Sequence, residues 1–402
     1  MSRTAENTIK GFLYQFHKTA QSILTSEYDD TVTVEGVIED IDVAHGDGSF
    51  TAIQCKYHES NQNFSPSLIY KPLLQMAEQF STSSGANITY VLFVHTSDTE
   101  QNSRQVTLEE LDQALESTNQ KLAPIIRRIS PTFDKESFLE NVRLEFGSSL
   151  DDLANEIKSS LGELRIQNSD VDNILYPNCI NHIATLSCNT GASNREIDRH
   201  SLENMLARVN STAITKWTLA LKDKKALLTS KKKQISANLS QNSRERCIYF
   251  MSEQIQDFED RFVVFVSNYL AKYHNKAAHI KTPIFSIDCT EDKLFELEHR
   301  LYLKRIKAHT GYIGTRFIES EFFKDPISRG ARSLVSEREF QIRLFSSQTH
   351  PELLNSRKCD DIFFIGNEIP ENVDCTDIET SILGVPDTNE LEFVLSMRNS
   401  YE

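Results

Sequence analysis

The feature that most constrains the fold is a run of short β-type segments that begins at residue 31. TVTVEGVIEDIDVA (31–44) is rich in β-branched residues, HGDGS (45–49) favours a turn, and FTAIQCKYHE (50–59) continues as an extended segment. This order predicts a β-hairpin. Gly36 interrupts the first arm, so we expect that arm to form two strands.

Helical patterns flank this β-rich region. TIKGFLYQFHKTAQSILT (8–25) carries apolar residues at helical spacing and predicts an amphipathic first helix. Downstream, Pro72 suits the first turn of a helix through LLQMAEQF, and ITYVLFVHT (88–96) is typical of a buried strand. The predicted order is therefore α-β-β-β-α-β.

A chain of 402 residues exceeds the usual size of one hydrophobic core, so we expect two domains. The helical pattern from about residue 105 to 165 gives way to a looser stretch at 164–178. We place the boundary there, with domains at 1–165 and 166–402. The first is expected to be α/β, with a central mixed sheet flanked by helices, and the second a helix-rich α+β domain.

Charge and hydropathy limit the possible partners. No run approaches the roughly eighteen apolar residues that a membrane span needs, which predicts a cytoplasmic protein without a membrane partner. A net charge of −15 argues against nonspecific coating of nucleic acid. The basic segment 216–246 is either a DNA or partner contact or the solvated side of a helix. Residues 359–402 contain eleven acidic residues and one basic residue, Arg398. Because this stretch would repel DNA, we expect it to face protein.

Strand alternation gives the segment 50–59 two different faces. Gln54 and Lys56 point together, whereas Ile53 and Cys55 point the other way. Asp40 ends the segment EGVIED and is expected across the hairpin from Gln54. One face therefore suits packing and the other suits chemistry.

This polar face has the residue types that phosphodiester hydrolysis requires. Such hydrolysis needs a divalent ion, a polarised water and a positive group near the developing charge. Carboxylate and carbonyl-type oxygens are the ligands that Mg²⁺ prefers. We predict that Asp40 and Gln54 bind Mg²⁺ or Mn²⁺, with the backbone carbonyl of Cys55 as a third ligand. Lys56 would orient the attacking water or stabilise the negative charge that develops on the phosphate.

These residues resemble a known family. GFLYQF, VEGVIEDIDV and IQCKYHE, within about the first 100 residues, are similar to the PD-(D/E)xK nuclease superfamily in the QxK form of Mrr-like enzymes. They resemble more closely the double-stranded DNA endonuclease domain of bacterial antiphage effectors. These effectors include CBASS endonucleases, nucleases paired with HerA-type ATPases, and the Lamassu nuclease subunit, whose partner is an SMC-like ATPase.

The resemblance implies a restriction-endonuclease-like fold and metal-dependent cleavage of double-stranded DNA. It further implies a complex with an SMC-like or HerA-like ATPase and other defence subunits, with activity withheld until the ATPase or homo-oligomerisation releases it. The chain contains no GxxxxGK[ST] loop, so any ATP dependence must come from another subunit.

The family commonly has an acid where this chain has the glutamine of QxK. Asp40 would therefore have to neutralise most of the metal's charge, unless Glu35, Glu39 or Asp42 also binds the ion. Alternation would put Asp40 and Asp42 on one face, and a bulge would bring Glu35 round as a fourth catalytic residue. Some relatives have a metal-supporting polar residue on the first helix, where this chain has Gln15.

Other interpretations remain open. The polar residues of the hairpin would also suit a cross-strand ion pair and hydrogen bond on a solvated face. The chain would then be a noncatalytic DNA-binding or assembly subunit; a further alternative is a stand-alone Mrr-like restriction endonuclease. His58 and Glu59 would extend the site. Four residues suggest zinc but lack a paired CxxC, namely Cys179, His182, Cys188 and His200.

Overall fold

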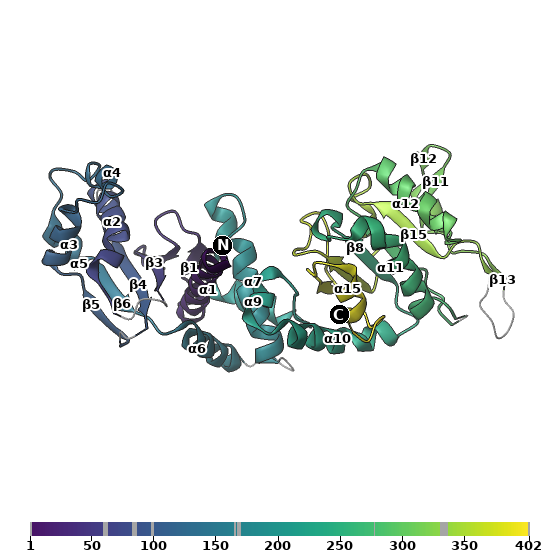
Figure 1. Ribbon diagram of the computed structural model, residues 1–402, viewed down its shortest axis with the longest axis horizontal. Helices are drawn as coiled ribbons and strands as arrows, with labels where there is room; N and C mark the ends of the chain where they lie inside the picture. Colours follow the sequence, from purple (N-terminus) through teal and green to yellow (C-terminus); the bar gives the residue numbers. More distant parts are fainter. Residues whose placement is uncertain are drawn as a thin grey trace. The chain divides into compact units, whose positions relative to one another are not determined.

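The computed structural model describes residues 2–58, 63–82, 87–97, 100–164, 166, 170–276, 278–329 and 337–400. The chain divides into two compact units, Met1–Arg208 and Val209–Glu402 (Figure 1). The first unit thus extends well beyond residue 165, where the sequence suggested a boundary.

The described part of the first unit is built around a seven-stranded mixed sheet of order β5-β6-β4-β3-β2-β1-β7. β1, β2 and β3 pair antiparallel in sequence order, whereas β3, β4 and β6 run parallel. The predicted order α-β-β-β-α-β and the central mixed sheet are confirmed. The strands are β1 (Thr31–Val34), β2 (Ile41–Ala44), β3 (Phe50–His58), β4 (Ile88–Thr96), β5 (Asn102–Gln105), β6 (Val142–Phe146) and β7 (Glu196–Ile197).

Helices cover both faces of this sheet (Figure 1). On one face the ring of Tyr14 from α1 lies 4.8 Å from Tyr57 and 5.4 Å from Phe93, and α6, α7 and α8 pack around α1. On the other face α2 to α5 bury Leu92 and Val94. The helices are α1 (Ser2–Thr25), α2 (Tyr70–Thr82), α3 (Leu108–Leu115), α4 (Ala123–Ile126), α5 (Lys135–Glu140), α6 (Leu150–Glu163), α7 (Tyr176–Leu186) and α8 (Arg199–Ala207).

Two parts of the first unit differ from the sequence prediction. The segment expected to be helical up to residue 165 contains β6, whose buried Val142, Leu144 and Phe146 alternate with more exposed residues. The stretch at 164–178 leads into α7, which packs on α1, and β7 then pairs with the edge of β1. Burial of α7 and pairing of β7 place the chain up to Arg208 in the first unit.

The described part of the second unit has a six-stranded sheet of order β10-β15-β9-β8-β16-β17, in which all neighbours run parallel. This is an α/β unit, not the α+β arrangement predicted. The strands are β8 (Arg246–Phe250), β9 (Ile284–Ile287), β10 (Ala308–His309), β15 (Ile342–Ser346), β16 (Asp361–Ile365) and β17 (Glu379–Ile382). Two small hairpins pair β11 (Tyr312–Ile313) with β12 (Arg316–Phe317), and β13 (Ser328–Arg329) with β14 (Glu337–Arg338).

Apolar cores lie on both faces of the parallel sheet. α10, α11, α12 and α15 cover one face, and α13 and α14 cover the other. β8 was missed in the sequence because RCIYF is a short, fully buried run inside a helical region, and periodicity does not separate such a run from helix. The helices are α9 (Lys216–Leu221), α10 (Lys224–Ser240), α11 (Phe258–Tyr273), α12 (Glu291–Leu303), α13 (Glu319–Phe322), α14 (Leu353–Ser356) and α15 (Thr388–Val394).

Among the described residues, no helix is both long enough and apolar enough to cross a lipid bilayer.

Candidate active site

The hairpin of β2 and β3 brings Asp40 and Gln54 together. Asp40 directly precedes β2, and the antiparallel register pairs Ile41 with Ile53, so the next position along β3 lies opposite Asp40. The carboxylate of Asp40 accepts a hydrogen bond from the side-chain amide of Gln54 and one of 2.9 Å from the backbone N–H of Cys55. Cys55 thus offers Asp40 its N–H, whereas the sequence analysis assigned its carbonyl to a metal.

Lys56 lies on the same face of β3 as Gln54, as alternation predicts, and remains partly exposed. Burial is the main effect on Asp40 and raises the pKa of its carboxyl group. The N–H of Cys55 and the charge of Lys56 act in the opposite direction. Asp40, Gln54 and Lys56 therefore form one small polar cluster.

Asp42 holds the loop that carries Asp40. Its carboxylate accepts hydrogen bonds from the backbone N–H groups of Val37, Ile38 and Glu39, at 2.7, 2.8 and 3.0 Å. Alternation does not extend across residues 35–40, because they form a loop between β1 and β2. Asp42 is committed to this loop, which makes it a positioning residue.

Gly36 lies directly against that carboxylate. A Cβ added at Gly36 would sit 2.3 Å from the carboxyl carbon of Asp42, far inside van der Waals contact. The glycine therefore permits the close approach of loop and carboxylate. From the sequence, Gly36 was expected to divide the strand region and to allow a bulge that brings Glu35 round; its close approach to Asp42 was not predicted.

Glu39 joins the cluster, although the sequence analysis named it only as one of three acids that would support Asp40. Burial, followed by the charge of Asp40, raises the pKa of Glu39 to about 8, and Lys56 acts in the opposite direction. The nearby hydroxyl of Tyr90, from β4, is buried and has no hydrogen-bond partner among the described residues. This corner of the site thus holds a carboxyl group and a hydroxyl with unused hydrogen-bonding capacity.

Glu35 reaches the site from the end of β1. Its backbone has a φ of 50°, a left-handed conformation that is uncommon for a residue other than glycine. The amide of Gln15, on α1, donates hydrogen bonds to the Glu35 carboxylate at 3.0 Å and to the backbone oxygen of Asp40 at 3.4 Å. Burial, followed by the charge of Asp40, raises the pKa of Glu35. Gln15 therefore links Glu35 to the Asp40 loop.

Arg195 also supports Glu35 and was not anticipated from the sequence. Its guanidinium donates to the backbone oxygens of Val34 and Glu35, at 2.9 and 2.6 Å. Arg195 is 160 positions further along the chain than Glu35, in a segment that the sequence analysis assigned to the second domain. No local pattern signals such a distant contact.

His58 continues the polar row of β3. Its Nε2 atom is buried and has no hydrogen-bond partner among the described residues. Burial, followed by the charge of Lys56, lowers the pKa of His58. Glu59 lies outside the described residues.

Across the described ranges, no three His, Cys, Asp or Glu side chains gather in a way that would hold a metal ion. Cys179, His182, Cys188 and His200 are thus not assembled into a zinc site. At the hairpin, the side chains that offer oxygen are Asp40, Glu39 and Gln54. Mg²⁺ usually keeps several waters and takes only one or two carboxylates from the protein, so this smaller set is still sufficient.

Several cations of the basic segment 216–246 have partners within the second unit. Lys224 forms an ion pair with Glu390, and Arg244 forms a bidentate pair with Asp361 at 2.7 and 2.8 Å. Lys231 is fully buried, where it donates to Ser211 at 2.6 Å. Three cations of the basic segment, Lys224, Arg244 and Arg246, thus form ion pairs with acids of the stretch 359–402.

A scan of protein-family models finds none that matches the chain, and a search of curated proteins finds no match. The assignment of the site consequently depends on the geometry and chemistry of its own residues.

Proposed function

We propose that the first unit is a metal-dependent endonuclease that cleaves double-stranded DNA and has a restriction-endonuclease-like fold. The observation that carries this proposal is the convergence of Asp40, Gln54 and Lys56 at one end of the β2–β3 hairpin. The resemblance of GFLYQF, VEGVIEDIDV and IQCKYHE to antiphage endonucleases supports the same reaction class.

The residues present fit a hard divalent cation. The pKa values of Asp40 and Glu39 are both raised, chiefly by burial, and the charge of Asp40 raises that of Glu39 further. A bound cation would offset the electrostatic cost of keeping both carboxylates charged. The Gln54 amide has an oxygen and a nitrogen of similar shape, so a half-turn would present oxygen where it now donates to Asp40. Asp40, Glu39 and Gln54 are thus the residues that would hold Mg²⁺ or Mn²⁺.

Such an ion, when bound, supplies Lewis-acid polarisation of the phosphate and an acidified water. The chain's own residues supply the rest. Lys56 places a positive charge beside the phosphate and orients the attacking water. Gln15 and Arg195 hold Glu35 in position through hydrogen bonds. Asp42 holds the loop of residues 37–39, which lies between Glu35 and Asp40. Glu35 accepts a hydrogen bond from the side-chain amide of Gln15 and lies on the α1 side of the cluster.

The proposed biological role is that of a cytoplasmic effector in a bacterial antiphage complex of the Lamassu type. Its partners would be double-stranded DNA and an SMC-like or HerA-like ATPase with further defence subunits. Release by that ATPase, or by homo-oligomerisation, would switch on the nuclease. These partners are inferred from the resemblance, and the chain's lack of a phosphate-binding GxxxxGK[ST] loop supports a separate ATPase.

One observation favours a second candidate function. Because no three acidic, His or Cys side chains within the described ranges are arranged to hold a metal ion, the same fold would also suit a noncatalytic subunit that binds DNA or a partner. In that case Lys56 would contact phosphate without any bond cleavage.

Plasmid cleavage separates the two candidates. Supercoiled plasmid is incubated with the full chain and Mg²⁺, with and without the ATPase subunit encoded beside it. Asp40→Asn and Lys56→Met are each expected to lower the cleavage rate by about 10²-fold or more. The matched control is Lys71→Met, an exposed lysine on α2. Cleavage that persists in both site variants contradicts the site assignment, and binding without cleavage under all conditions favours the noncatalytic subunit.

A further inference from the structure

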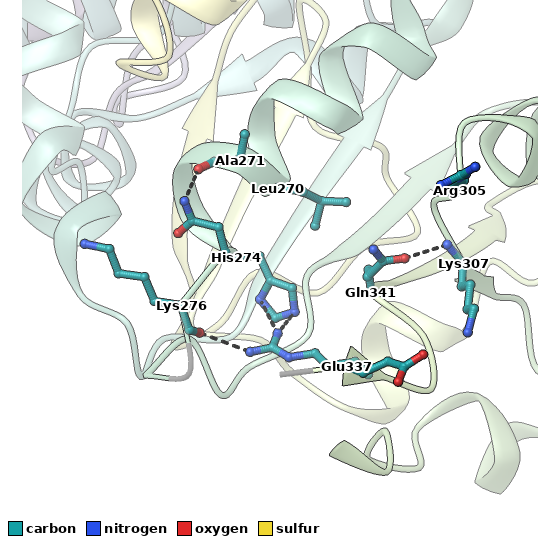
Figure 2. Close-up of a pocket in the computed structure, with 10 residues that line it drawn as sticks. Leu270, Ala271, His274, Lys276, Arg305, Lys307, Glu337 and Gln341 are labelled. Atoms are coloured by element: carbon teal, nitrogen blue, oxygen red, sulfur yellow. Dashed lines mark hydrogen bonds between the residues drawn. The ribbon is translucent and has the colours of Figure 1, made fainter. Parts of the chain in front are cut away.

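The second unit contains a pocket of about 490 Å³ at the edge of its sheet where the strands begin (Figure 2). Lys307 directly precedes β10, Gln341 directly precedes β15, and the end of α11 closes the side. In parallel sheets, ligands usually bind at the opposite edge, beyond the carboxyl ends of the strands. The chemistry of this pocket must therefore be inferred from its own side chains.

Cations dominate the lining. Lys276, Arg305, Lys307 and Arg338 line the pocket, and Glu337 is the carboxylate in the same lining. No ion pair joins Arg305 or Lys307 to a carboxylate within the described part of the chain. Figure 2 shows the Lys276 side chain extending away from His274 and Gln341, so Arg305, Lys307 and Arg338 remain as the candidate ligands in the lining. Such a cluster is unusual in a chain with a net charge of −15.

Arg338 is held in place by uncharged groups. Its guanidinium contacts the imidazole of His274 and donates to the backbone oxygens of His279 and Lys276, at 2.6 and 3.2 Å. Burial, followed by the charge of Arg338, lowers the pKa of His274 to about 3, so the imidazole is neutral. The positive charge of Arg338 is thus fixed in position without a partner carboxylate among these contacts.

Arg305 occupies a position that favours glycine. The N–H groups of Arg305 and Ile306 donate to the carbonyls of Tyr302 and Leu301, at 2.8 and 3.0 Å, which is the hydrogen-bond pattern of a Schellman motif at the end of α12. Arg305 has a φ of 59°, the left-handed conformation that such motifs usually give to glycine. A long cationic side chain at this position is a local cost to the fold, and strain of this kind is typical of functional positions.

We propose that this pocket binds a small phosphate-bearing anion through Arg305, Lys307 and Arg338. Guanidinium groups bind phosphate oxygens in pairs, and the volume lies within the usual range of small-molecule sites. A duplex presents its phosphates along an extended surface, so a concave site of this size favours a small ligand. The proposal is independent of the nuclease assignment, because all of these residues belong to the second unit.

Isothermal titration of the full chain with four probes, namely inorganic pyrophosphate, ADP, adenosine and a short DNA duplex, tests the proposal. Inorganic pyrophosphate and ADP are expected to bind and adenosine is not. Arg305→Gly should weaken binding of both anions by at least about tenfold while leaving the melting temperature equal or higher, because glycine relieves the backbone strain. Lys307→Gln should weaken binding similarly. Lys233→Gln, which removes an exposed lysine of α10 outside the lining, is the control and should bind normally.

Three results would overturn the proposal. One is that neither anion binds at millimolar concentration. Another is that Arg305→Gly and Lys307→Gln bind as tightly as the unchanged chain. The third is that only a short DNA duplex binds and loses affinity in these variants, which would assign the cations to a nucleic-acid surface. Binding of ADP without pyrophosphate supports the proposal, provided that Arg305→Gly weakens it.

Discussion

The side-chain amide of Gln54 donates a hydrogen bond to the carboxylate of Asp40 across the β2–β3 hairpin. An amide in this position satisfies a buried acid without adding negative charge. A carboxylate there would repel Asp40 until a cation bound between them. The proposed metal site thus predicts that the identity of residue 54 sets how strongly the stability of the first unit depends on metal.

Gln54→Glu tests this dependence. Without metal, the variant is expected to lose about 1–3 kcal/mol of unfolding free energy, because it replaces a hydrogen-bond donor to Asp40 with a second buried carboxylate. With Mg²⁺ it should regain more stability than the unchanged chain does. Urea unfolding in EDTA and in Mg²⁺ gives both values. Gln75→Glu, on the exposed side of α2, is the control, and equal responses to Mg²⁺ in the two variants would contradict a metal site at Asp40.

A pair of glycine substitutions tests the loop that carries Asp40. Gly36→Ala would force its Cβ against the Asp42 carboxylate and is expected to cost more than about 2 kcal/mol and to abolish cleavage. Gly11→Ala, on α1, meets nothing within 4 Å and should instead add about 0.5–1 kcal/mol of helix stability. Chemical denaturation measures both. If Gly36→Ala were neutral, Asp42 would not be the residue that fixes the loop.

The extent of the first unit is tested by truncation. A chain ending at residue 165 lacks β7, which pairs with β1, and α7, whose Tyr176 hydroxyl lies 2.7 Å from Nε2 of the buried His17. It is expected to aggregate or to unfold without cooperativity, since it exposes a strand edge and an apolar helix face. A chain ending at residue 208 should unfold cooperatively. Size-exclusion chromatography and thermal melts distinguish the two, and a well-folded 1–165 fragment would contradict the observed boundary.

Lys231 gives the second unit a predictable pH dependence. Burial lowers the pKa of its ammonium to about 7, so the unfolded chain binds a proton more readily than the folded chain does between about pH 7 and 10. Its contribution to stability should therefore rise as pH increases through this window. Lys231→Met should be more stable than the unchanged chain at pH 7, and the difference should shrink towards pH 10. Denaturant melts at several pH values measure this; a difference that is constant with pH would refute the buried, shifted lysine.

The parts of the fold that the sequence predicted are those determined locally. The hairpin needs only a turn and two β-rich arms, and its register then places Asp40 opposite Gln54 and, through alternation, sets the face of Lys56. The same logic accounts for the order of the first elements.

The missed parts depend on contacts between distant segments. β8 is a strand because it pairs in parallel with β9 and β16 inside a six-stranded sheet, and its own five residues do not reveal this. Arg195 meets Glu35 because the segment 192–195, which follows α7, lies against β1. Asp42 seemed a possible metal ligand because alternation was extended through residues that in fact form a loop. Propensity and periodicity describe neighbours in sequence, and each of these features is decided by tertiary structure.

The bridge from Gln15 to Glu35 and to the main chain of Asp40 has a mechanical consequence. β3 and β4 are paired along nine residues and form a rigid part of the sheet. The acids, in contrast, lie on a short loop that is hydrogen-bonded to α1. A small shift of α1 would displace these acids before it distorted the paired strands. Displacement of α1 would therefore move Glu35 and the backbone of Asp40 relative to Gln54 and Lys56 on β3.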